Sequence, residues 1–169
     1  MIRRVAVVLL AAGLAAAMTV GHQVGLSAAA THGGALCTLN GTATFSKGLT
    51  TKTQTVSYTF TGSVSSCQST DRTVKSGSVS AAGSGSISCA NGTTSGTASV
   101  AWNNGHNSSI SFKTTSAGSL TAITGKVTSG EFVGGQTVGA VSFTTTTPQA
   151  CLKGGLTSLG FTGVISTVV

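Results

Sequence analysis

The sequence has very few residues that could carry acid–base or metal chemistry. Its 169 residues contain two carboxylates, Asp71 and Glu131, and three histidines. A Ser-His-Asp triad would have to combine His106 with one of these carboxylates, and no serine lies in a Gly-x-Ser-x-Gly turn. Glycoside hydrolysis would need the two carboxylates about 5–10 Å apart, which nothing in the sequence requires. We therefore predict that the protein is not an enzyme and holds no metal or cofactor.

Proline and helical periodicity are also scarce. Pro148 is the single proline, whereas a disordered or mucin-like stalk would be rich in proline and poor in hydrophobic patterning. No stretch after residue 30 repeats apolar residues at helical spacing. These absences argue against a stalk and a helical domain, although Gly, Ser and Thr make up about half of residues 31–169.

The first thirty residues have the features of a cleaved signal peptide (1–30). Arg3 and Arg4 precede an uncharged apolar run, 5–20, and three consecutive alanines end at Ala30. The run is shorter than the roughly 20 apolar residues of a spanning helix, which disfavours an uncleaved membrane anchor. We predict cleavage after Ala30, export by the general secretory or the twin-arginine route, and no membrane span in the mature chain. The protein is expected to be secreted or associated with the cell envelope.

The mature part, 31–169, has the length of a single domain. Its cysteines are even in number, and none of their spacings resembles a zinc or redox motif. Oxidised pairing is the expected state outside the cytosol, so we predict two disulfides. The four cysteines are Cys37, Cys67, Cys89 and Cys151.

One of the three possible cysteine pairings is favoured by a predicted hairpin. If Cys37 faces Cys67, the turn centres near residue 52, within the predicted loop 47–52, and opposed residues are close enough for a disulfide. This favours Cys37–Cys67 with Cys89–Cys151. The pairing has one inconsistency, because inward residues of this strand are even-numbered up to Val64 whereas Cys67 is odd. The strand must therefore bend or bulge at Ser65-Ser66.

Apolar residues alternate with threonine and serine at a period of two, which is typical of strands with one buried face. The pattern covers 38–45, 55–64, 97–102, 110–112, 138–143 and 159–165. Glycine- and asparagine-rich turns separate these runs, and Asn-Gly at 104–105 predicts a type I′ hairpin turn. We predict an all-β domain of about eight antiparallel strands, arranged as a sandwich or a barrel and stabilised by disulfides.

The positive charge is dispersed along the chain. Without the signal peptide, seven basic and two acidic residues remain, a net charge of +5. Binding of nucleic acid would require clustered basic residues with aromatic platforms, so we predict no nucleic-acid partner. The expected partner is an unidentified extracellular or cell-envelope component.

Two features suggest interaction sites, each with a simpler interpretation. Arg72 and Lys75 lie in a charged stretch soon after Cys67, as in the disulfide-anchored loop of a protease inhibitor; a solvated loop or charged edge strand is the simpler interpretation. Trp102 and Tyr58 could stack on sugars, but both fall on inward-facing patterns that predict core packing.

Several segments of the mature chain resemble small secreted proteins that are common in actinobacteria. They are CTLNGTATF at 37–45, SCANG at 88–92 with GTA at 96–98 and Trp102, GKVTSGEF at 125–132, CL at 151–152 and FTG at 161–163. The resemblance implies export and an antiparallel β-domain, and it assigns no site residues.

The composition, rich in Gly, Ser, Thr and Ala, is also similar to that of the neocarzinostatin-type apoproteins. That resemblance implies a two-disulfide immunoglobulin-like sandwich with a cleft for an apolar ligand, although the cysteine spacing and the basic charge here differ. From all these features we predict a non-enzymatic secreted or cell-surface binding or structural module. The alternatives are a protease inhibitor acting through Arg72 or Lys75, and a carrier of a small apolar ligand.

Overall fold

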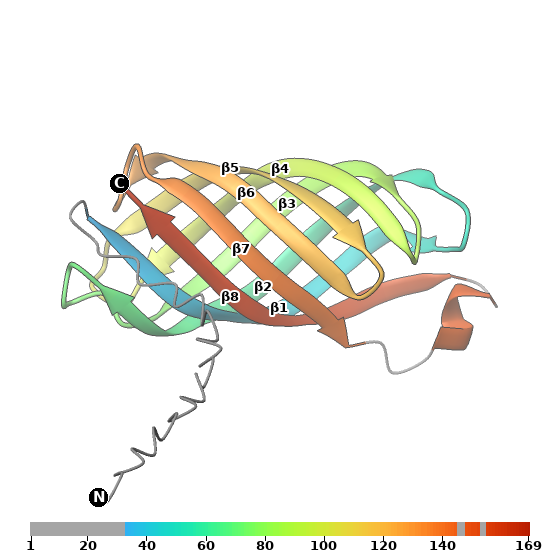
Figure 1. Cartoon of the computed structure of the whole chain (residues 1–169), viewed down its shortest axis with the longest axis horizontal. Helices are drawn as coiled ribbons and strands as arrows, with labels where there is room; N and C mark the ends of the chain where they lie inside the picture. The colour runs from blue at the N-terminus through green and yellow to red at the C-terminus, as the bar shows by residue number, and fades with distance from the viewer. Residues whose placement is uncertain (1–32, 145–147, 153–154) are drawn as a thin grey trace, which may run out of the picture.

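The computed structural model describes residues 33–144, 148–152 and 155–169. The predicted signal peptide with its cleavage site after Ala30 lies outside these residues, as do His32 and Lys153. Eight strands and one short 3-10 helix occur within them (Figure 1). They are β1 (Gly34–Leu49), β2 (Gln54–Ser69), β3 (Gly77–Ile87), β4 (Asn91–Trp102), β5 (Asn107–Ala117), β6 (Leu120–Gly130), β7 (Gln136–Thr144), η1 (Pro148–Cys151) and β8 (Leu156–Val168). No helix of the described segments is long and apolar enough to cross a membrane.

The eight described strands form a closed antiparallel barrel in which each strand pairs with the next along the chain. β8 returns to β1 and closes the sheet, with Gly34 opposite Val168 and Ala43 opposite Leu159. The all-β prediction is therefore confirmed, and of the two predicted architectures the chain adopts the barrel.

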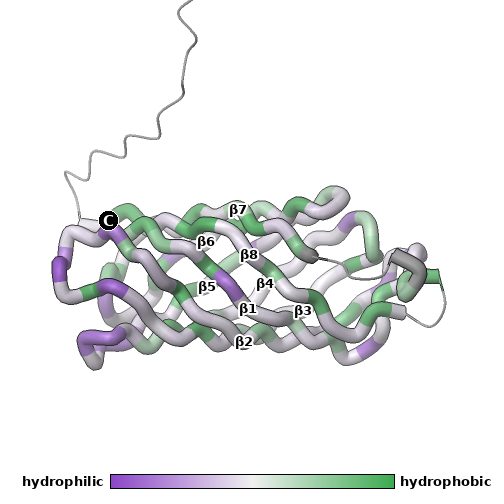
Figure 2. Tube along the Cα trace, turned by 90° about the horizontal axis from the view of Figure 1, so that it is seen from below, coloured by the Kyte–Doolittle hydropathy of each residue, from purple (hydrophilic) through white to green (hydrophobic). Residues whose placement is uncertain are grey.

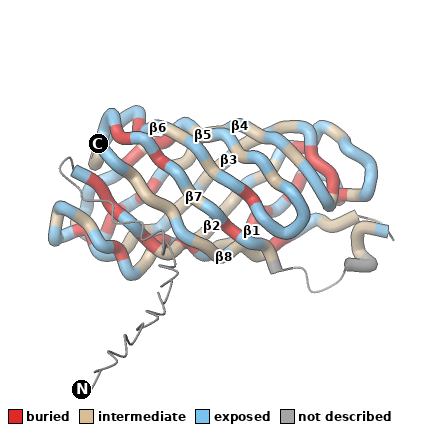
Figure 3. The backbone as a smooth tube through the Cα atoms, in the orientation of Figure 1, coloured by how far each residue is buried: buried red, intermediate tan, exposed pale blue. Residues whose placement is uncertain are grey.

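The period-two pattern divides each strand between the interior and the outer surface. In β2, the side chains of Val56, Tyr58 and Phe60 are buried or half-buried, whereas Ser57 and Thr59 are exposed. Figure 2 shows strongly hydrophilic residues mostly in the loops at the barrel ends. Figure 3 shows buried segments near both ends, with half-buried and exposed residues alternating along the strands between them. Serine and threonine thus cover the outside, and apolar residues face the axis.

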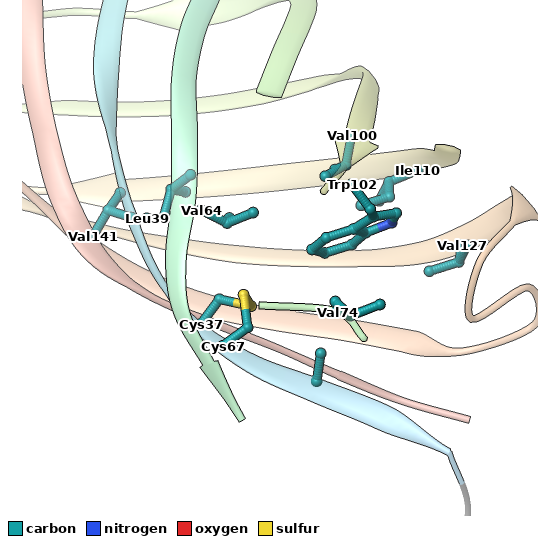
Figure 4. Close-up of a cluster of buried hydrophobic side chains, with 11 residues drawn as sticks. Cys37, Leu39, Val64, Cys67, Val74, Val100, Trp102, Ile110, Val127 and Val141 are labelled. Atoms are coloured by element: carbon teal, nitrogen blue, oxygen red, sulfur yellow. A yellow bond between two sulfur atoms is a disulfide. The ribbon is translucent and has the colours of Figure 1, made fainter. Parts of the chain in front are cut away.

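One end of the barrel, where β8 ends, is closed by a packed group of side chains that we call the floor: Cys37, Cys67, Val74, Trp102 and Phe132. Val74 is 0% exposed although it belongs to the β2–β3 connection, because that loop folds across the barrel end. The rings of Trp102 and Phe132 meet edge to face at 5.8 Å between centroids. Figure 4 shows the Trp102 indole above Val74 and the disulfide.

The favoured disulfide pairing is confirmed. Cys37 bonds to Cys67 and Cys89 bonds to Cys151, with Cα–Cα distances of 4.1 and 6.2 Å. The predicted irregularity in β2 is also confirmed, because the β1–β2 register shifts opposite this segment and Ser66 has a φ of 52°. The bulge reverses the parity of the strand and turns Cys67 into the interior.

The predicted type I′ turn between β4 and β5 is wrong. Gly105 has a φ of 86°, but Asn104 does not have the positive φ that a type I′ turn needs at its first central residue. The Gly105 N–H donates to the carbonyl of Trp102 (3.0 Å), and the Trp102 N–H donates to that of His106 (2.9 Å). This is a type I turn followed by a left-handed glycine, a longer hairpin connection that Asn-Gly also serves.

Candidate functional site

The structure brings together two of the residues considered for catalysis, outside the barrel at the floor end. His106 Nδ1 lies 2.7 Å from Glu131 Oε2, but the His106 side chain is 66% exposed. The Asp71 carboxylate instead accepts hydrogen bonds from the hydroxyl and the backbone N–H of Thr73 (2.7 and 2.8 Å). Both bonds lower the pKa of Asp71, and the bond from the Thr73 hydroxyl has the larger effect.

No activated nucleophile accompanies the His106–Glu131 pair in the described part of the chain. The Ser108 hydroxyl accepts a hydrogen bond from Trp102 Nε1 (2.8 Å) and donates one to the backbone carbonyl of Glu131 (2.7 Å). No described serine or threonine hydroxyl bonds to the His106 ring, as nucleophilic catalysis would require. Among these residues no group of three or more His, Cys, Asp and Glu side chains could hold a metal ion.

The predicted interaction loop is exposed at its charged side chains and tied down along its backbone. Arg72 and Lys75 are both exposed, whereas Val74 between them is buried in the floor. The N–H of Lys75 donates to Asn103 Oδ1 (2.8 Å), and the Lys75 carbonyl accepts from the N–H of Cys67 (3.1 Å). The interaction role of Arg72 and Lys75 stays a prediction.

The barrel interior holds a cavity of about 180 Å³, which we call the lumen. The floor closes one end, and the exposed turn residues Ala90 and Gly118 line the lumen at the other, which we call the mouth. A cavity of about 150 Å³ lined by apolar side chains stays dry and binds benzene. The lumen therefore has room for a small organic molecule.

Aromatic rings and small residues on neighbouring strands both line the lumen. Phe161 of β8 packs edge to face against Phe60 of β2 and Phe143 of β7, with ring centroids 6.4 and 5.9 Å apart. Ala81 of β3 and Ala98 of β4 are cross-strand partners that also line the lumen. Methyl groups at these positions leave space that larger side chains would fill, and the result is a hollow apolar interior.

Several hydroxyl groups interrupt this apolar lining, and three of them form a hydrogen-bonded chain. The Tyr58 hydroxyl lies 2.9 Å from Thr94 Oγ1, which lies 2.7 Å from Thr114 Oγ1. Tyr58 is on β2 and Thr94 is on β4, so the tyrosine ring must cross β3. Gly83 permits the crossing, since a Cβ at that position would stand 2.8 Å from the Tyr58 hydroxyl.

The lumen carries no formal charge on the described residues that line it. They include no Asp, Glu, Lys, Arg or His, and Cys37, Cys89 and Cys151 are in disulfides. Tyr58 is the single tyrosine of the chain and the remaining titratable group of the lining. Burial raises its pKa above the ordinary value of 10.0, and the hydrogen bond with Thr94 opposes this in part.

This shift predicts how tyrosine ionisation is linked to stability. A raised folded-state pKa means that the neutral phenol contributes stability below pH 10, which is lost as pH rises through the folded pKa. We expect tyrosinate absorbance to appear at higher pH in the folded protein than in urea, and Tyr58→Phe to reduce the loss of stability above pH 10. Identical titration curves in the two states would contradict this burial effect.

The sequence predicted the inward direction of Tyr58 and Trp102, and the structure confirms it for both. The residue pattern did not predict a barrel lumen or the roles of Thr94 and Thr114, although a carrier with an apolar cleft was one of the predicted alternatives and Thr94 shares the inward parity of Ala98. No family model, curated protein or solved structure matches this chain, so its function is inferred from the lumen itself.

Proposed function

We propose that this protein is a non-enzymatic secreted carrier that binds a small apolar ligand in the lumen. The observation that carries the proposal is the hollow, aromatic-lined interior, closed at the floor and reaching exposed turns at the mouth. An eight-stranded barrel is just wide enough for side chains to fill it or for one small ligand to replace some of them.

The unfilled volume is the first support for this proposal. Interiors selected for stability alone are close-packed. An empty space of about 180 Å³ would cost about 4 kcal/mol, at roughly 24 cal/mol per Å³ of cavity. A ligand that fills the lumen recovers much of this free energy, because burial of apolar surface stabilises by about 25 cal/mol per Å².

The chemistry of the lining is the second support. It offers apolar contacts, two disulfides and a few hydroxyls, which bind without activating a ligand. The His106–Glu131 pair lies outside the lumen, beyond the floor. Two disulfides fit an oxidising compartment, in agreement with the predicted signal peptide.

The alternative functions have less support. For a protease inhibitor, Arg72 or Lys75 would need an accessible loop backbone, but Val74 is buried and backbone groups of Lys75 are bonded internally. Attachment to a cell-envelope component remains a hypothesis that is compatible with carriage of a ligand.

A matched pair of substitutions on β3 tests the carrier proposal. Ala81 lines the lumen, whereas its neighbour Ala82 is exposed on the outer surface. With para-ethyltoluene as probe, calorimetry should detect binding to the mature wild-type protein. Ala81→Leu should weaken it at least about tenfold, since forcing extra methylene groups into a filled site costs about 1–3 kcal/mol. Ala82→Leu should leave it unchanged. Equal effects of the two variants would overturn the proposal, as would failure of the wild type to bind any neutral aromatic probe of this size.

A further inference from the structure

We infer that the lumen selects an uncharged ligand bearing one hydroxyl group, which hydrogen-bonds to Tyr58 at the head of the Tyr58–Thr94–Thr114 chain. The inference rests on the proposed carrier function and names its ligand class: a compact apolar alcohol or phenol of about seven to ten non-hydrogen atoms, scaled from the benzene-binding cavity of about 150 Å³.

Counting hydrogens shows that the hydroxyl chain has unused hydrogen-bonding capacity. Each of the three hydroxyls supplies one donor hydrogen and can accept up to two bonds. The chain contains two hydrogen bonds, Tyr58–Thr94 and Thr94–Thr114, so one of its three hydrogens is unused within it. If the chain runs from Tyr58 to Thr114, the Tyr58 oxygen accepts from a ligand; if it runs the other way, the phenol donates. A hydroxyl group matches both directions, whereas a carbonyl matches one.

The position of these groups identifies Tyr58 as the contact. Thr94 lies in the middle of the chain, where its oxygen is bonded to both neighbours, and Thr114 lies at the far end. The Tyr58 hydroxyl lies at the end of a ring that crosses Gly83 along the inner face of β3. The Phe45 ring lies 6.1 Å from the Tyr58 ring between centroids, so the phenol ring has an aromatic neighbour and an apolar ligand body can pack against the two rings.

The absence of charge on the described lining explains why the ligand is neutral. A carboxylate or ammonium group placed in the lumen would lose its hydration without meeting an opposite charge on these residues. A purely apolar ligand would avoid that penalty, but it would leave the capacity of the hydroxyl chain unused. A neutral hydroxyl is the group that satisfies both constraints.

Three probes of similar size test the inference: para-ethylphenol, para-ethyltoluene and para-methylbenzoate. The first two differ by a hydroxyl in place of a methyl group, and the third carries a negative charge. Binding is measured by calorimetry on the mature wild-type protein, on Tyr58→Phe, and on Thr59→Val, which removes an exposed hydroxyl from the outer face of β2. Tyr58→Phe leaves Thr94 and Thr114 bonded to each other, so the Thr94 hydroxyl keeps a hydrogen-bond partner in the variant.

We expect Tyr58→Phe to weaken para-ethylphenol about three- to tenfold, the effect of one hydrogen bond, and to leave para-ethyltoluene unchanged. Thr59→Val should change neither affinity, and para-methylbenzoate should bind the wild type at least about tenfold more weakly than the phenol. If para-ethyltoluene binds but Tyr58→Phe affects both neutral probes equally, or if the benzoate binds as well as the phenol, the inference is wrong and the carrier proposal stands. If none of the probes binds the wild type, the carrier proposal itself fails.

Discussion

Combining Cys37→Ala with Cys67→Ala is expected to lower the free energy of unfolding by about 3–4 kcal/mol. The bond closes a loop of 30 residues in the unfolded chain, which restricts that state. It also fills part of the floor, where both half-cystines are buried beside Val74. Urea unfolding followed by the fluorescence of Trp102, the single tryptophan, measures the change.

The second disulfide provides the matched control. Cys89–Cys151 closes a loop of 62 residues, and doubling a loop adds only about 0.6 kcal/mol of closure entropy. Cys89 and Cys151 are half-buried, so replacing them with alanine leaves a smaller gap than replacing the buried floor cysteines. Each buried group the size of a methylene that is lost costs about 0.8 kcal/mol. The floor disulfide should therefore contribute more. A larger loss for Cys89→Ala with Cys151→Ala would show that loop length, rather than floor packing, decides the order.

Trp102→Ala is expected to destabilise the protein by about 3–5 kcal/mol, the usual cost of removing a buried aromatic side chain. The indole is 9% exposed, packs edge to face on Phe132, and donates to the Ser108 hydroxyl. Its loss opens the floor and breaks the link through Ser108 to the carbonyl of Glu131. Because the variant has no tryptophan, unfolding is followed by circular dichroism.

An exposed residue at the same barrel end serves as the control for Trp102→Ala, because its substitution should disturb no buried packing. Val133 follows Phe132 in the β6–β7 connection and is 56% exposed. Val133→Ala should change the unfolding free energy by less than about 0.5 kcal/mol. A cost below about 1 kcal/mol for Trp102→Ala would mean that the floor is not a packed core.

Much of the fold could be predicted because alternation is local. Residues 55–64 carry large apolar side chains at every inward position but Gly62, and they lie within β2. In β3 the inward residues include Ala81, Gly83 and Gly85, whose small side chains give almost no hydrophobic period. That strand is specified by the rings that pack over it from other strands. The choice of barrel over sandwich depends on the β1–β8 pairing, for which the chain has no local signal.

The candidate site was harder to predict for a related reason. A lumen is the difference between the volume that eight strands enclose and the volume that their side chains fill, so no single segment encodes it. Thr94 is 36 positions from Tyr58 and 20 from Thr114, and their contact depends on Gly83 letting the ring cross β3. The sequence indicated that each of these side chains points inward, but it did not indicate that they contact one another. The bulge at Ser66, in contrast, was predictable because the disulfide required it.

The closure of the barrel by β8 affects a chain that is still being synthesised. β8 pairs with residues far earlier in the sequence, and the hydrogen bond from Thr162 to Asn40 spans 122 positions. A polypeptide that has emerged only as far as β7 is an open sheet, with unpaired backbone groups along both β1 and β7. Such edges can recruit a strand from another molecule. Protection from such pairing therefore arises in one step, when β8 adds to both edges at once.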